Sequence, residues 1–86
     1  MSGPPKRIEW AAEAQDQLRA IELTTARRIL QAIDDFVTDG TGEVKKLRPP
    51  RNDLRLRVGD YRVFFYQTAP TAIKIIGVKH RSQAYR

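Results

Sequence analysis

Residues 54–66 read LRLRVGDYRVFFY, and this stretch predicts a β-hairpin. Apolar and basic residues alternate strictly from Leu54 to Val58, which is typical of a strand with one buried face. Gly59 and Asp60 follow as a two-residue turn, which we expect to be of type II′ because glycine comes first. The chain then returns over residues 61–66 as an antiparallel partner strand.

A two-residue turn fixes the register of the two strands and therefore the content of each face. Pairing starts at Val58 opposite Tyr61 and continues outward. One face then carries the expected core residues Leu54, Leu56, Val58, Tyr61, Val63 and Phe65. The other face, which we expect to be open, carries Arg55, Arg57, Arg62, Phe64 and Tyr66. Like charges that oppose each other destabilise a sheet, so this placement favours a surface that normally holds an anion.

Helices are expected before the hairpin and a further strand after it. A short strand is predicted over residues 6–10, and helical spacing of apolar residues begins at Ala11. A second apolar stripe runs from Ala26 to Val37, and we expect Thr24 or Thr25 to cap that helix. Residues 44–47 are a weak strand candidate, and residues 72–78 form a last strand whose apolar faces favour the sheet interior.

The predicted order is therefore β-α-α-β-β-β. This order indicates an α+β fold in which a helical hairpin packs on one face of a small, mostly antiparallel sheet. A chain of 86 residues buries one modest core, so we expect residues 1–86 to form a single domain.

Basic charge is concentrated in the second half of the chain. Of the 16 lysines and arginines, eleven follow Glu43, where the only acidic residues are Asp53 and Asp60. A lopsided field of this kind attracts a polyanion, and a phosphate backbone is the usual one. An ordinary basic surface is the alternative interpretation.

Composition also excludes several classes of site. The chain has no cysteine and one histidine, which excludes a thiolate metal site and disfavours one built on histidines. Neither an apolar leader nor a membrane-spanning run is visible, so we expect a soluble protein of the reducing cytoplasm.

The expected open face has the chemistry of a single-stranded RNA site. Arginine offers forked donors to phosphate, and aromatic rings stack on bases. Splayed bases and phosphates of single-stranded RNA engage both kinds of group at once. The alternative is that the arginines only solvate the sheet, with Phe64 and Tyr66 packed by the tail.

The tail, residues 79–86, reads KHRSQAYR and surrounds one phenol with basic groups. Nearby cations stabilise a phenolate, which makes Tyr85 a candidate general base. A tyrosine near a chain end is also often a packing residue, and a lone histidine such as His80 is usually structural or exposed.

The hairpin and the tail together resemble the RelE/ParE family of bacterial type II toxins. The resemblance rests on GDYRVFFY at residues 59–66 and VKHRSQAYR at residues 78–86, and it extends over nearly the whole chain, including Lys46-Leu47-Arg48. It implies a RelE-like fold and a toxin that a co-expressed antitoxin keeps silent. The toxin–antitoxin complex is then expected to bind operator DNA through the antitoxin.

RelE-like members cleave messenger RNA on the ribosome without a metal or other cofactor, and the resemblance carries their roles onto this chain. Tyr85 matches the base, and Arg62 and Arg55 match the residues on the phosphate. Lys79, His80 or Arg81 matches the acid or charge stabiliser. The remaining candidates for RNA contact are Lys45, Lys46, Arg48, Arg57 and Phe64.

One departure from the family pattern concerns Asp53, which stands where better-known relatives carry a lysine. That contact is then lost or supplied by Lys45, Lys46 or Arg57. Two other functions stay open: a ParE-like toxin that inhibits DNA gyrase without cutting RNA, and a non-toxic RNA-binding module.

Overall fold

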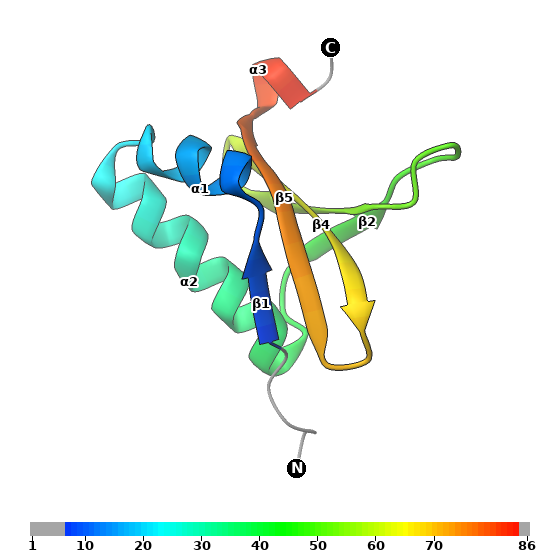
Figure 1. The fold of residues 1–86 in the computed structure, drawn as a ribbon. Coiled ribbons are helices and arrows are strands. Elements are labelled where there is room, and N and C mark those ends of the chain that lie inside the picture. Colours follow the sequence, from blue (N-terminus) through cyan, green and yellow to red (C-terminus); the bar gives the residue numbers. More distant parts are fainter. Residues whose placement is uncertain (1–6, 85–86) are drawn as a thin grey trace.

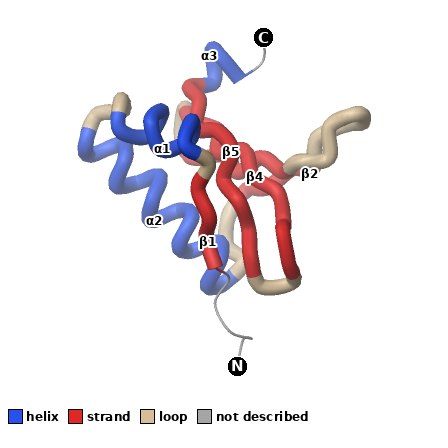
Figure 2. Tube along the Cα trace, in the orientation of Figure 1, coloured by secondary structure: helices blue, strands red, loops and turns tan. Residues whose placement is uncertain are grey.

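The computed structural model describes residues 7–84, which form five strands and three helices (Figures 1 and 2). The elements are β1 (Arg7–Trp10), α1 (Ala12–Arg19), α2 (Leu23–Asp39), β2 (Glu43–Lys46), β3 (Leu54–Val58), β4 (Tyr61–Ala69), β5 (Ala72–His80) and α3 (Arg81–Ala84). They make one sheet of order β1-β5-β4-β3-β2, in which β1 runs parallel to β5 and all other pairs are antiparallel. The predicted α+β fold is confirmed.

Two features of the element order differ from the prediction. Residues 43–46 are a full strand, so four strands rather than three follow the helical hairpin. This strand has one half-buried residue and lies at the sheet edge, which is why its apolar signal is weak. The tail also begins with a short helix, α3, which was not predicted.

The core lies between the sheet and the two long helices. Ile29 and Ile33 of α2 pack against Leu56 and Val63 of the hairpin, and all four are 2% exposed or less. Phe65 is 1% exposed, and its ring centroid lies 5.3 Å from that of Phe36 on α2. The alternating apolar residues of the hairpin therefore face the helices, as predicted. No helix among residues 7–84 is long and apolar enough to cross a membrane.

The hairpin register agrees with the prediction at every pair. Val58 lies opposite Tyr61, and Arg57 opposite Arg62. Gly59 has φ +58°, whereas none of the described residues other than glycine, Asp60 included, has a positive φ. A positive φ at the first turn position alone fits the type II′ turn.

A bulge in β5 decides which of its side chains face the helices. Phe64 pairs with Gly77 but Phe65 pairs with Ile75, so Ile76 is an extra residue in β5. The backbone N–H of Val78 donates to Oε1 of Gln17 at 2.7 Å, which ties α1 to the strand beside the bulge. The alternation therefore changes phase at Ile76, and Val78 joins the core.

The cap of α2 differs from the prediction. Glu22, not Thr24 or Thr25, is the N-cap residue, and both threonines lie inside the first turn. The Glu22 carboxylate accepts the backbone N–H groups of Thr24 at 3.0 Å and Thr25 at 3.2 Å. A longer acidic side chain thus does what a threonine hydroxyl was expected to do, and these bonds hold the pKa of Glu22 below its ordinary 4.5.

Because Phe65 and Tyr66 lie on different faces of β4, their substitution should lower stability by very different amounts. Phe65→Ala should lower the free energy of unfolding by about 3–5 kcal/mol, because it leaves a cavity in the core. Tyr66→Ala, on the other face, should lower it by about 1 kcal/mol or less. Urea denaturation of both variants measures this. Equal losses would contradict the assigned faces.

The cap predicts a pH-dependent contribution of Glu22 to stability. Because the folded pKa is depressed, the contribution is complete above pH 4.5 and is lost as the pH falls through the folded pKa. Glu22→Gln should therefore melt at a lower temperature than the parent protein at neutral pH. The two melting temperatures, followed by circular dichroism, should converge well below pH 4.5. A constant difference across this range would show that the carboxylate charge plays no part.

Candidate functional site

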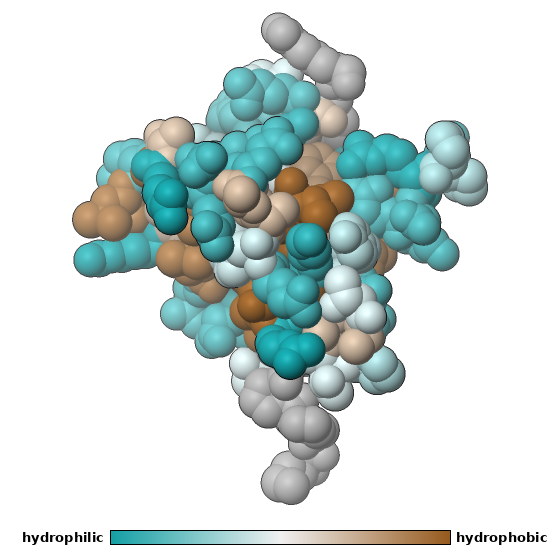
Figure 3. Space-filling view, viewed as in Figure 1, coloured by the Kyte–Doolittle hydropathy of each residue, from teal (hydrophilic) through white to brown (hydrophobic). Residues whose placement is uncertain are grey.

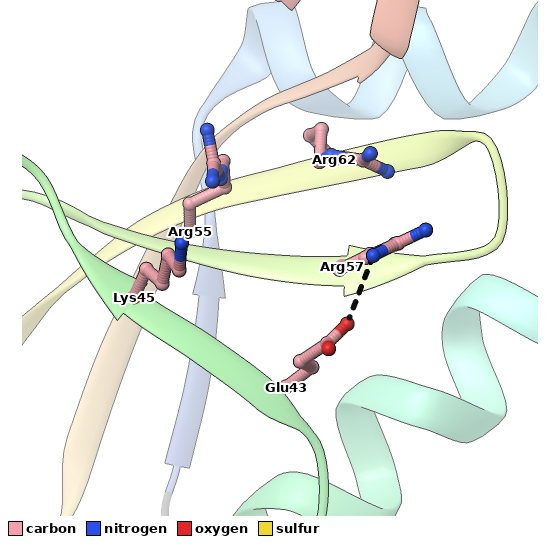
Figure 4. Close-up of a pocket in the computed structure, with 5 residues that line it drawn as sticks. All are labelled: Glu43, Lys45, Arg55, Arg57 and Arg62. Carbon is pink, nitrogen blue, oxygen red and sulfur yellow. Dashed lines mark ion pairs between the residues drawn. The ribbon is translucent and has the colours of Figure 1, made fainter.

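A pocket rich in positive charge lies on the sheet face away from α1 and α2 (Figure 4). It has a volume of about 200 Å³ and is lined by Glu43, Lys45, Arg55, Arg57 and Arg62. We call it the cationic pocket. Its residues come from three adjacent strands, and the strand register brings them together: Lys45 pairs with Arg55, while Glu43 pairs with Arg57, which pairs with Arg62.

Lys79 extends this row on the fourth strand. It pairs with Arg62 across β4 and β5 and is exposed. Directly opposed residues of a sheet point to the same face. Lys79 therefore lies on the same side of the sheet as the cationic pocket, next to Arg62.

Arg62 is buried, which corrects the expectation of an open position. It is only 5% exposed, and its Nη1 donates to the backbone carbonyls of Gly59 and Tyr61, both at 2.9 Å. The guanidinium folds back onto the hairpin turn instead of extending into solvent. These bonds fix the group in place, so little side-chain entropy remains to be lost when it binds an anion.

Phe64 is also buried, at 6% exposure, although it lies on the predicted face. The guanidinium of Arg51 lies 5.3 Å from its ring centroid. Nε of Arg51 in turn donates to Oδ1 of the buried Asp53 at 3.0 Å, and Nη2 donates to Oδ2. The loop before β3 thus contributes to covering Phe64, and Asp53 serves to hold that loop residue.

His80 lies on the opposite side of the sheet from the cationic pocket. It pairs with Tyr61, and the two rings meet edge to face with centroids 5.3 Å apart. Its Nδ1 accepts the backbone N–H of Ser82 at 3.2 Å, within the first turn of α3. The bulge at Ile76 causes this placement, because it reverses the alternation along the end of β5.

The remaining predicted residues are spread more widely. Arg81 is the exposed first residue of α3, and its backbone N–H donates to the carbonyl of Asp60 at 2.7 Å. Arg48 is exposed in the loop before β3, and Lys46 lines a separate hollow with Tyr66. Tyr85 lies outside the described residues.

Sequence reasoning missed Glu43 as a member of the site. Its ion pair with Arg57 spans 3.5 Å and places one carboxylate among four cations (Figure 4). The alternation of Glu43 and Lys45 along β2 puts both side chains on one face. That face could be identified only once the pairing of β2 with β3 was known. Within residues 7–84 no three acidic, histidine or cysteine side chains gather as a metal site would require.

Comparison with known proteins places these features in context. A family model described as the ParE toxin of the type II toxin–antitoxin system parDE matches residues 8–85. No curated protein matches the chain.

Several solved structures share the fold. An archaeal RelE–RelB complex from Pyrococcus horikoshii OT3 contains a chain that is 24% identical, with a TM-score of 0.75 over 93% of this chain and 99% of that one. The toxin–antitoxin complex RelBE2 from Mycobacterium tuberculosis gives 21% identity and a TM-score of 0.78 over 91% and 100%. A mutant of the E. coli toxin RelE in the free state gives 18% and 0.71 over 95% and 88%.

Removing the charge of Glu43 tests whether the cationic pocket binds anions through its positive charge. Glu43→Gln should bind a single-stranded oligonucleotide about two- to fivefold more tightly, because the exposed ion pair with Arg57 then no longer competes with phosphate. Fluorescence anisotropy at several salt concentrations measures this. Asp16→Gln, which removes an exposed carboxylate on α1, is the control and should have a smaller effect. Equal gains would mean that only net charge matters.

Proposed function

The chain belongs to the ParE toxin family of type II toxin–antitoxin systems, and we propose that it acts as a metal-independent, ribosome-dependent endoribonuclease that cleaves messenger RNA and stops translation. The observation that carries this proposal is the cationic pocket. Four basic side chains from three strands converge on one small volume, with Lys79 beside them. Preorganised cations of this kind stabilise the charge that develops on a phosphate in its transition state.

The proposed reaction is a transfer within the RNA strand. The 2′-oxygen of one nucleotide attacks the adjacent phosphorus, and the bond from phosphorus to the 5′-oxygen of the next nucleotide breaks. The products are a 2′,3′-cyclic phosphate and a free 5′-hydroxyl. A base must take the proton of the 2′-hydroxyl, and an acid must give one to the leaving oxygen.

Arg62 and Arg55 are assigned to the phosphate, and Tyr85 to the base. Arg62 is held by the turn carbonyls and Arg55 is half-buried, so both present their charge from a restricted position. Arg57 and Lys45 complete the pocket and bind the RNA backbone. Lys46 and Arg48 are further contacts along the strand.

Lys79 is our choice for the acid among the three tail candidates. It lies beside Arg62 on the face of the cationic pocket, whereas His80 lies on the other face. His80 is instead assigned a positioning role, because its Nδ1 accepts a backbone N–H of α3, the helix that leads to Tyr85. Arg81 is placed to add charge near the tail.

An antitoxin is the proposed protein partner. Two of the structures with this fold, from P. horikoshii and M. tuberculosis, are toxin–antitoxin complexes. We expect a partner with acidic and amphipathic segments, since these complement the basic face. Binding to operator DNA would take place through that partner.

Inhibition of DNA gyrase without RNA cleavage is the second candidate function. The description of the matching family as ParE toxins favours it. It would use the same fold without needing Tyr85 or Lys79 as proton-transfer groups.

Cleavage mapping tests the proposal directly. The purified protein is added to a cell-free translation reaction, and the 5′ ends of the message are mapped by primer extension. New ends within codons should appear, and Arg55→Ala should reduce their rate of formation by about a hundredfold or more. Tyr85→Phe should abolish them.

Arg27→Ala is the matched control. It also removes an exposed arginine, but from α2, which packs on the sheet face opposite the cationic pocket. It should cleave like the parent protein. Intact message and normal translation with the parent protein would overturn the ribonuclease proposal, and a gyrase supercoiling assay would then test the second candidate.

A further inference from the structure

The loop between β2 and β3 brings a further arginine, Arg51, onto the sheet face that holds the cationic pocket. The loop projects from the sheet (Figure 1), and its surface is mostly hydrophilic (Figure 3). The pairing of the two strands continues past β3, since the backbone N–H of Leu47 donates to the carbonyl of Asp53 at 3.1 Å. Asp53 is two residues before Arg55, so alternation puts both side chains on the face away from the helices.

The carboxylate of Asp53 holds the guanidinium of Arg51 in a fixed orientation. Nε donates to Oδ1 at 3.0 Å and Nη2 donates to Oδ2, so one edge of the planar group is paired with both carboxylate oxygens. A two-point pair of this kind fixes the direction of the plane as well as its position. The Asp53 side chain is 7% exposed and that of Arg51 is 54% exposed. The carboxylate is therefore covered, while the guanidinium still borders solvent.

This pairing changes what Arg51 offers to a ligand. Its positive charge is already matched by the buried carboxylate, so it adds little to the attraction that Lys45 and Arg55 exert on phosphate. It keeps a flat, weakly hydrated surface of the kind that stacks on aromatic rings. One ring is already present, because the centre of the guanidinium lies 5.3 Å from the ring centroid of the buried Phe64. The second side of the plane is available for another ring.

The position of this plane relative to the cationic pocket decides which ring could reach it. Phe64 pairs directly with Arg55, which lines the pocket. Opposed side chains of a sheet lie about 5 Å apart at Cβ. A strand whose phosphate lies in the pocket therefore has an adjoining base within reach of Arg51.

We propose that the Arg51 guanidinium is a stacking platform for one unpaired base of the RNA strand that the cationic pocket holds. From the sheet outward the order is Phe64, Arg51 and the base. Unpaired RNA bases stack on arginine planes as well as on aromatic rings. The stacking role expected of Phe64 thus passes to the group that covers it. The inference rests on the proposed function, since the pocket and the platform must engage the same strand.

Two uncleavable strands of equal charge separate stacking from electrostatic attraction. One is a short, fluorescently labelled 2′-O-methyl single strand, and the other has the same length but carries no bases. Fluorescence anisotropy at low salt gives both dissociation constants. The parent protein should prefer the strand with bases by about fivefold or more. Arg51→Lys keeps the charge without the plane, so it should bind that strand about five- to a hundredfold more weakly and the abasic strand like the parent protein.

Asp53→Asn provides a second variant with the opposite effect on charge. It frees the guanidinium from its carboxylate, so the abasic strand should bind more tightly and the preference for bases should shrink. Arg27→Lys, the same exchange at an exposed arginine of α2, is the control and should bind both strands like the parent protein. Circular dichroism melting checks that each variant is folded.

Two results would overturn the platform alone: equal losses of affinity for the two strands in Arg51→Lys, or equal binding of both strands by the parent protein. Failure of the parent protein to bind either strand would overturn the platform together with RNA binding by the cationic pocket. Cleavage itself is decided separately, by the primer-extension experiment.

Discussion

The register of the β3–β4 hairpin determines which side chains face the helices and which face away from them. Gly59 takes a positive φ, so a two-residue turn closes and Val58 comes to lie opposite Tyr61. Side chains alternate along a strand, so a slip of one residue would turn the apolar set outward and the arginines toward the helices. Burying unpaired guanidinium groups is far more costly than losing a turn. One local turn therefore fixes both the core and the cationic pocket.

Four cations around one pocket repel one another, and the fold offsets this repulsion with nearby acceptors. Arg62 donates to two carbonyls of the turn, and Arg57 pairs with Glu43 on the neighbouring strand. The Glu43 carboxylate is exposed, so a phosphate group would compete well with it for Arg57. The helices pack on the other face of the same strands, and their rigid core supports the pocket from behind. Stability is thus supplied by one face of the sheet, and the proposed binding by the other.

Features of the fold that depend only on neighbouring residues could be predicted from the sequence. The hairpin, its register and the content of each face followed from alternation and a two-residue turn. The burial of Arg62 did not follow, because it depends on how one side chain folds back onto the turn. The face on which His80 lies could not be predicted, because the extra residue Ile76 reverses the alternation in β5 and nothing in the sequence marks that bulge. Glu22 was missed as a cap because glutamate is not among the usual capping residues.

We propose that RNA binds on the sheet face opposite the helices. Chemical-shift mapping tests it most directly: the ¹⁵N-labelled protein is titrated with uncleavable single-stranded RNA, and the backbone amides that shift are assigned. The largest shifts should lie on β2, β3 and β4, around Lys45, Arg55 and Arg62. Shifts confined to α1 and α2 would contradict it.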